Sequence, residues 1–331
     1  MKLALTFYSV LKMPIADIIS CSIAAEEAGF EYISMAESFY RDASVLGAAI
    51  ASNTDRIKLG SSIFPIHTRM PFQIAMATAT LDELSNGRMG FIGLGAGYRN
   101  RIEKYFGAKV ENSLAKIKEY AEVIRGLLSA QDFSYQGKFF NFELFPKLVP
   151  EALRVPILFG SSGDKMLKLA GQVADGVILN SIGTPEYYEH VLSVLNEEGR
   201  RPDNFEIASS IIFSVADKHE DAIEAARPDV LFYFLYPELD AVIEKTPYKE
   251  QVAVIRKLNA QGRHKEALSL VTDDMVENLS VSGTAKDCRN KIRKLADYGI
   301  TIPVIRVSVQ PFDEARRKAV FLEAIDTLKS I

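Results

Sequence analysis

The chain has 331 residues, of which 48% are hydrophobic and 25% charged, a composition that is typical of folded globular proteins and excludes a largely disordered chain. Its formal net charge of −4 gives no overall attraction to nucleic acid or to an anionic membrane, so small molecules are the expected ligands. No apolar run is long enough to span a bilayer, and Cys21 and Cys288 are the only cysteines and form no CxxC pair, so we expect a cytoplasmic protein with two buried, reduced thiols.

Short apolar or β-branched segments alternate with longer amphipathic segments along the chain, which is the pattern of parallel strands covered by helices. The predicted strands cover residues 2–7, 31–35, 57–63, 90–95, 156–159, 176–180, 206–215 and 303–309. The predicted helices cover residues 15–29, 44–53, 72–84, 113–128, 165–173, 185–198, 220–234 and 314–330. Eight such units predict one α/β domain over residues 1–331, a TIM (β/α)₈ barrel.

Two segments are too long to be ordinary connections in such a barrel. Residues 130–150 are rich in aromatic side chains, and residues 237–281 contain additional helical pattern. We therefore expect insertions after strands 4 and 7. Insertions of this length usually build lids or interfaces.

A glycine-rich segment ends the fourth strand, at Gly93, Gly95 and Gly97. It does not fit the dinucleotide-binding fingerprint, because Tyr98 stands where the third glycine is needed. Taken alone, it favours a tight backbone turn. The same glycines would also let a flat ring approach the main chain closely, and Gly95 is the candidate contact.

A turn of small residues, Gly160, Ser161, Ser162 and Gly163, joins the fifth strand to the next helix. Such a turn presents backbone N–H groups at the positive end of a helix and is suited to bind a phosphate group. Simple capping of the helix by Ser162 explains the local sequence equally well. If the turn binds phosphate, we expect a Gly163→Val change to strain it and to weaken binding.

Glu37 follows the second strand, at the end of the barrel where active sites are built. It is our candidate for exchanging a proton with a cofactor ring or a substrate, and an exposed ion pair with Arg41 is the alternative. No metal site is expected. His67 is the only histidine close to a strand end, and the chain contains no HxH or HExxH spacing.

Several segments resemble the luciferase-like superfamily in their order and sequence. The resemblance rests on residues 56–71 (RIKLGSSIFPIHTRMP), 79–88 (ATLDELSNGR) and 93–97 (GLGAG), and it continues through residues 39–42, 123–128, 135–140 and 160–169. The Tyr-Arg-Asp of residues 40–42 and the Thr-Arg-Met-Pro of residues 68–71 resemble the branch that uses coenzyme F420, which includes methylenetetrahydromethanopterin reductase.

The resemblance implies where a cofactor would bind. It implies a non-prolyl cis peptide at Ser62–Ile63 that supports the face of a flavin-like ring, and a cofactor phosphate at the turn that begins at Gly160. It also implies a homodimer. We nominate the helix of residues 72–84 for this contact, through its apolar residues Ile74, Ala75, Ala77, Thr78 and Leu81.

The expected function is therefore a coenzyme F420-dependent oxidoreductase that transfers hydride to or from a small organic or pterin-like substrate. One alternative is an FMN-dependent monooxygenase on the same barrel, and another is a flavin-binding barrel without activity. Two departures from the family pattern bear on this choice. Ser38 stands after Glu37 where many relatives have histidine, and Thr6 stands where methanopterin reductases tend to carry an acid.

Overall fold

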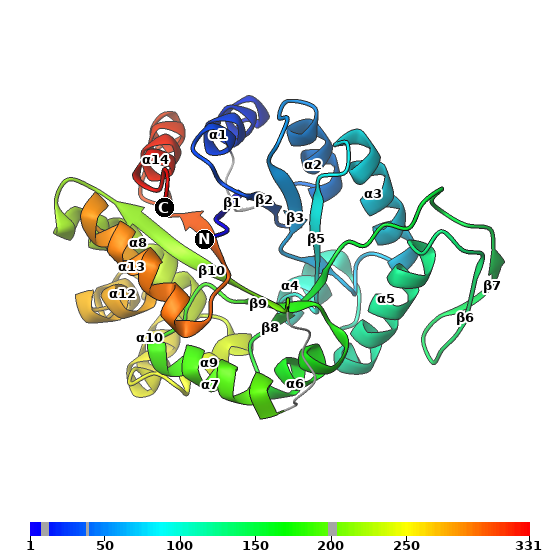
Figure 1. The fold of residues 1–331 in the computed structure, drawn as a ribbon. Helices are drawn as coiled ribbons and strands as arrows, with labels where there is room; N and C mark the ends of the chain where they lie inside the picture. The colour runs from blue at the N-terminus through cyan, green and yellow to red at the C-terminus, as the bar shows by residue number, and fades with distance from the viewer. Residues whose placement is uncertain (8–12, 38–39, 198–203) are drawn as a thin grey trace.

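The computed structural model describes residues 1–7, 13–37, 40–197 and 204–331. Eight parallel strands form a closed barrel, because each pairs with the next and the last pairs with the first (Figure 1). In barrel order they are β1 (Ala4–Phe7), β2 (Tyr32–Met35), β3 (Lys58–Ser61), β5 (Met89–Gly95), β8 (Ile157–Ser161), β9 (Gly176–Leu179), β10 (Glu206–Val215) and β12 (Ile302–Val307). The predicted TIM barrel is confirmed.

Eight helices surround the barrel and cover its outer face, as the sequence predicts (Figure 1). They are α1 (Ile15–Glu27), α2 (Ala43–Ala51), α3 (Pro71–Leu84), α5 (Ser113–Leu127), α6 (Asp164–Val173), α7 (Pro185–Glu197), α8 (His219–Phe234) and α14 (Glu314–Thr327). Capping side chains determine where several of these helices begin. Asp42, for example, accepts the backbone N–H groups of Ser44 and Val45 and so begins α2.

The barrel interior is packed with side chains and is not a pore. A small apolar cluster inside it includes Phe91, Leu158 and Ile302, whereas a much larger cluster fills the layer between strands and helices. Gly60 on β3 makes room for the Phe91 ring, since a Cβ atom at position 60 would lie 2.2 Å from the Cζ of Phe91. This close packing leaves free space only at the ends of the strands.

The first insertion is an antiparallel hairpin of β6 (Phe133–Gln136) and β7 (Asn141–Phe145), which lies between α5 and β8. Phe72 of α3 packs against the rings of Phe142 and Phe145. In Figure 1 the hairpin projects outward beyond α5, away from the barrel.

The second insertion follows α8 and is mostly helical. It contains η2 (Pro237–Leu239), α9 (Asp240–Ile243), α10 (Lys249–Ala260), α11 (His264–Ser269), α12 (Asp273–Leu279) and the short strand β11 (Val281–Gly283), which pairs with β10. The helices α13 (Ala285–Lys294) and η3 (Leu295–Tyr298) then lead into β12. Among the helices of the described ranges, none is long and apolar enough to cross a membrane.

Helix α3 does not present the apolar face that we nominated for a dimer contact. Ile74, Ala75, Thr78 and Leu81 are each at most 3% exposed, because they pack against the core of their own barrel, and Ala77 is only partly exposed. That part of the dimer prediction is wrong. The large apolar side chains that α3 turns toward solvent include Met76 and Leu84, which are 42% and 44% exposed.

Both cysteines are free and buried, Cys21 in α1 and Cys288 in α13. Burial raises the pKa of each thiol to about 12. Both are therefore poor nucleophiles at neutral pH.

Glu26, near the end of α1, anchors the chain that enters β3. Its carboxylate accepts the backbone N–H groups of Asp55, Arg56 and Ile57, the last two at 2.6 and 2.7 Å. Burial acts to raise the pKa of Glu26, but these three hydrogen bonds outweigh it, so the pKa is lowered. Folding therefore stabilises the ionised form.

A Glu26→Gln change should lower the free energy of unfolding at pH 7 by about 1 kcal/mol, because the loss of charge weakens the three hydrogen bonds that the carboxylate accepts. A carboxyl group with a lowered pKa stabilises the fold above its unfolded-state pKa, and this contribution disappears as the pH falls through its folded-state value. The gap between the two proteins in urea unfolding should thus close below about pH 4. A gap that stays constant with pH would show that the ionised carboxylate is not responsible.

Candidate functional site

A cavity of about 370 Å³ lies at the carboxyl ends of the barrel strands. All eight strands, or the residues directly after them, contribute to its lining, which includes Thr6, Ala36, Ser62, Gly95, Gly160, Ile178, Ser210 and Val304. This is the end of a TIM barrel at which ligands bind. The volume lies at the lower end of the range that is typical of small-molecule sites.

The cavity brings together residues that the sequence analysis selected from four separate segments. Those that line it are Glu37, Ser62, Ile63, Gly95, Gly160, Ser161 and Ser162. Gly163 is not among the lining residues, and neither is any residue of the hairpin insertion. The strand order alone explains this convergence, because each segment follows a neighbouring or nearby strand of the barrel.

One wall of the cavity is formed by Ile63 together with Gly95 and Gly160. The peptide bond between Ser62 and Ile63 is cis, as the family resemblance implied. The Ile63 side chain packs beside two glycines, since a Cβ atom at Gly95 would lie 2.6 Å from its Cδ1 and one at Gly160 would lie 3.3 Å from its Cγ2. Larger residues at these two positions would press on the Ile63 side chain and so change the shape of this wall.

The turn after β8 leads into α6 without a side-chain cap. Gly163 is the N-cap residue, so the prediction that Ser162 caps this helix is wrong. Asp164 turns away from the cavity and contacts Nε2 of His190 at 2.8 Å, which keeps its carboxylate from opposing an anion. The first turn of a helix leaves backbone N–H groups without partners inside the helix, so the start of α6 is suited to bind an anion.

Gly163 does not have the conformation that our Gly163→Val expectation assumed. Its φ of −131° is extended backbone, which any residue adopts. The nearest atom to a Cβ built on it is the Cβ of Ala241, at 3.7 Å. A valine should therefore fit without strain, and that expectation is corrected.

Glu37 lines the cavity, but both of its carboxylate oxygens are engaged. Oε1 accepts Nε of Arg69 at 2.5 Å, and Oε2 accepts Nη2 of Arg69 at 3.1 Å and the backbone N–H of Ala43 at 2.9 Å. The expected alternative partner, Arg41, instead donates to the carbonyl of Met13. The Glu37 carboxylate is therefore held in place by Arg69 and by the start of α2.

A buried ion pair, which was not predicted from the sequence, lies beside the cavity. Nη2 of Arg306, on β12, lies 2.8 Å from Oδ1 of Asp229 on α8, and their side chains are 3% and 1% exposed. Arg306 lines the cavity, and its guanidinium lies 5.0 Å from the ring centroid of Tyr233. An arginine within an otherwise apolar strand, residues 302–307, was the signal that could have identified it.

The second insertion forms part of the cavity wall. Tyr236, just before η2, stacks on Tyr98 with ring centroids 4.2 Å apart, and Asn180 donates to the Tyr98 hydroxyl at 3.1 Å. Glu238 accepts the backbone N–H of Arg99 at 2.8 Å. These contacts link the loops after β5 and β9 to the insertion. One role of this long segment is therefore to hold the two loops in place.

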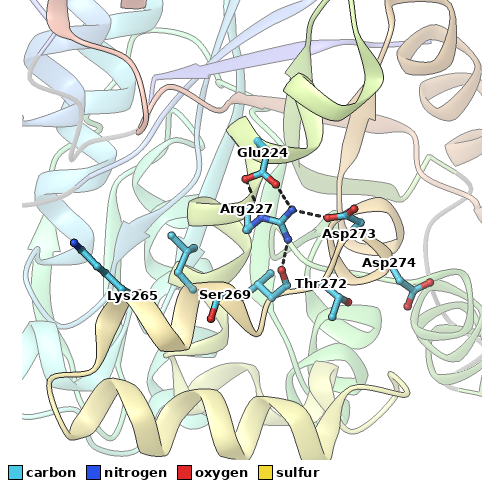
Figure 2. A pocket seen from close by; sticks show the side chains of 9 residues that line it. Glu224, Arg227, Lys265, Ser269, Thr272, Asp273 and Asp274 are labelled. Carbon is cyan, nitrogen blue, oxygen red and sulfur yellow. Dashed lines mark hydrogen bonds and ion pairs between the residues drawn. The ribbon is translucent and has the colours of Figure 1, made fainter.

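A second hollow lies on the surface beside α8, α11 and α12 (Figure 2). Arg227 occupies its centre, where it pairs with Glu224 and Asp273 and donates to the carbonyl of Val271. Figure 2 shows Lys265 and Asp274 at its edges. Because the arginine is already surrounded by acceptors, this hollow joins helices together and offers little for a ligand.

His67 does not line the main cavity, and its Nε2 lies 3.0 Å from the hydroxyl of Ser113. Burial, together with the charges of Lys116 and Arg99, lowers the pKa of His67. Within residues 1–7, 13–37, 40–197 and 204–331, no three His, Cys, Asp or Glu residues are grouped so that they could hold a metal ion.

Comparison with known proteins supplies the family. The profile described as luciferase-like monooxygenase matches residues 5–301. The chain belongs to the luciferase-like family. It is therefore an oxidoreductase of that family, with the fold and cavity described above.

Relatives match this luciferase-like protein over nearly its full length. A 5,10-methylenetetrahydromethanopterin reductase from Methanolobus tindarius is 29% identical over 318 residues, covering 94% of this chain and 96% of the relative. The enzyme of the same name from Methanopyrus kandleri is 30% identical over 332 residues, covering 92% and 93%. The structure of the coenzyme F420 dependent tetrahydromethanopterin reductase from Methanopyrus kandleri aligns with a TM-score of 0.84 at 26% identity, covering 99% and 97%.

Proposed function

We propose that this luciferase-like protein is a coenzyme F420-dependent oxidoreductase that transfers hydride to or from a small organic or pterin-like substrate. The observation that carries the proposal is the cavity, in which an apolar wall of Ile63 and Gly95 and a turn at a helix start, Gly160 to Ser162, face the same space. The wall suits a planar ring, and the turn suits a phosphate. Full-length similarity to the reductases supports the deazaflavin.

The residues present fit such a cofactor. Ser62, Ile63 and Gly95 would support the ring, and the N–H groups and hydroxyls of Ser161 and Ser162 would hold the phosphate, with Gly163 contributing through its backbone alone. When bound, the deazaflavin supplies the hydride. The protein orients the reactants and excludes water, and Glu37 with Arg69 fixes the charge at one edge of the cavity.

An FMN-dependent monooxygenase is the alternative that the family description favours. Among similar structures, one with bound FMN is 16% identical to this chain, which supports a common fold only. A barrel that binds a flavin without turnover is the second alternative. It rested on the absence of a histidine at position 38, which lies outside the described residues.

Equilibrium titration of the purified protein with coenzyme F420 and with FMN tests the cofactor. We expect F420 to bind with a Kd of roughly micromolar magnitude and FMN at least about tenfold more weakly. Tighter binding of FMN would favour the monooxygenase. Binding of neither cofactor would contradict the proposal.

Glu37 serves, in our proposal, mainly to hold Arg69 and the start of α2. Glu37→Gln should then reduce turnover less than about tenfold, because no proton transfer is lost. Arg69→Gln, the matched change at the other end of the ion pair, should have an effect of similar size. Rates of single turnover compare the two. A loss near 100-fold for Glu37→Gln alone would instead assign proton transfer to its carboxylate.

We also propose a homodimer, now through the solvent-facing side of α2 and α3. Val45 and Met76 are 70% and 42% exposed there, and Met70, before α3, is 50% exposed. Light scattering at micromolar concentration should give twice the mass of the 36.7 kDa chain. A Val45→Glu, Met76→Glu protein should give the monomer mass.

The two buried free thiols support the cytoplasm as the proposed location of the protein.

A further inference from the structure

Three hydroxyl groups form a chain that ends in the cavity. Ser181, two residues after the end of β9, lies with its Oγ 2.7 Å from the Oγ of Ser210 on β10 and 2.7 Å from the hydroxyl of Tyr233 on α8. All three residues line the cavity, and Ser181 and Tyr233 are only 3% and 4% exposed. The chain is therefore buried except where it meets the ligand space.

The direction of these hydrogen bonds leaves one proton for a ligand. Ser181 donates its single hydroxyl proton to Tyr233, so it accepts the proton of Ser210. The phenol of Tyr233 then has a proton of its own to donate. Across the described part of the chain, no protein group accepts it, and the cavity is where an acceptor can be placed.

The phenol ring is held in place by its surroundings. The guanidinium of Arg306 lies 5.0 Å from its centroid, and the ring of Phe232 packs edge-on at 5.2 Å. Asp229, one helical turn before Tyr233 on α8, fixes Arg306 through the buried ion pair. A donor held from several sides loses little entropy when it binds a reacting group, which is the arrangement that catalysis requires.

We propose that Tyr233 is the proton donor of the reaction, an inference that rests on the proposed function. As the substrate carbon gains hydride, one of its bonds to oxygen or nitrogen breaks: the π bond of a carbonyl, or one C–N bond of a methylene carbon that bridges two nitrogens. The oxygen or nitrogen that receives this electron pair takes the proton as the O–H bond of Tyr233 breaks. The resulting phenolate recovers a proton from Ser181, which takes one from Ser210, which takes one from water. For oxidation the same relay runs in reverse. Both carboxylate oxygens of Glu37 already accept hydrogen bonds from Arg69, so we assign proton donation to the Tyr233 phenol.

The experiment compares Tyr233→Phe, which removes the donor and keeps the ring, with Ser181→Ala, which cuts the relay behind it. The matched control is Tyr188→Phe. Tyr188 is buried and its hydroxyl lies 3.2 Å from Oγ of Ser209, the residue beside Ser210 on β10, but neither Tyr188 nor Ser209 lines the cavity. The control thus removes an equally buried hydroxyl outside the site.

Three readouts separate a catalytic from a structural role. They are F420 affinity, binding of methylenetetrahydromethanopterin in the presence of oxidised F420, which has no hydride to give for its reduction, and the single-turnover rate with reduced F420. For Tyr233→Phe we expect unchanged F420 affinity, about five- to tenfold weaker binding of the second ligand and a rate about 100-fold lower. Ser181→Ala should lose about tenfold in rate only. Tyr188→Phe should match wild type.

Any other result contradicts the donor role, the relay or the proposed function. A Tyr233→Phe rate within threefold of wild type overturns the donor role while leaving the proposed function intact. A parallel fall in F420 affinity assigns Tyr233 to the cofactor instead. If Tyr233→Phe does not fold, an undiminished rate in Ser181→Ala overturns the relay. A wild-type protein that binds no F420 overturns the proposed function, and the donor role with it.

Discussion

Replacement of Gly160 by valine is expected to weaken coenzyme F420 binding about 100-fold, which corresponds to about 2.7 kcal/mol, while the protein remains folded. Gly160 lines the cavity where β8 ends, and its Cβ position faces Ile63 and the carbonyl of Leu94 at 3.3 and 3.5 Å. A branched side chain there must displace Ile63 or extend into the cavity that both residues line. Fluorescence titration with F420 measures the loss.

Gly163→Val is the matched control for this change, three residues further along the same turn. Its φ of −131° and the open space around it permit a valine, and it lies outside the cavity lining. We expect its F420 affinity to stay within about threefold of wild type. If Gly163→Val loses as much affinity as Gly160→Val, the effect comes from the turn as a whole and not from the occupied cavity.

Replacement of Asp229 by alanine is expected to lower the free energy of unfolding by about 3–5 kcal/mol. Asp229 is the buried counterion of Arg306, and both side chains are at most 3% exposed. Without the carboxylate, the guanidinium stays buried and uncompensated, and the side chain of Gln310 also loses its acceptor. Urea unfolding followed by circular dichroism measures the change.

Two further proteins identify the cause of that loss. An Asp229→Leu, Arg306→Met protein removes both charges and should regain much of the lost stability, since an apolar pair of similar volume commonly replaces a buried ion pair at little cost. Glu197→Gln breaks the exposed pair with Lys168, whose atoms are 3.4 Å apart, and should cost less than about 0.5 kcal/mol. A doubly changed protein no more stable than Asp229→Ala would contradict the charge argument.

The alternation of strands and helices could be predicted from the sequence because it is a local property. Each of the eight barrel strands lies within two residues of its expected boundaries. The segments at Glu37 and Gly160 were found in the same way, because each follows a strand and the barrel topology then brings strand ends together. Ser62 was found from the family resemblance instead.

Contacts between distant residues could not be predicted in this way. Glu37 pairs with Arg69, 32 positions away, and Arg306 pairs with Asp229, 77 positions away, so no local spacing links them. The prediction of the dimer face was wrong for a related reason. An apolar residue such as Ile74 has the same periodicity whether it packs on its own core or on a partner, and here it packs on its own core.

The central claim is that the cavity holds a deazaflavin for hydride transfer. Its most direct test is a single-turnover reaction without oxygen, in which the protein is mixed with reduced coenzyme F420 and methylenetetrahydromethanopterin or a small ketone. The account predicts stoichiometric oxidation of F420 by at least one of these acceptors, with the rate abolished in Gly160→Val. Failure with both acceptors, together with FMN-dependent oxygen consumption by the same preparation, would contradict it.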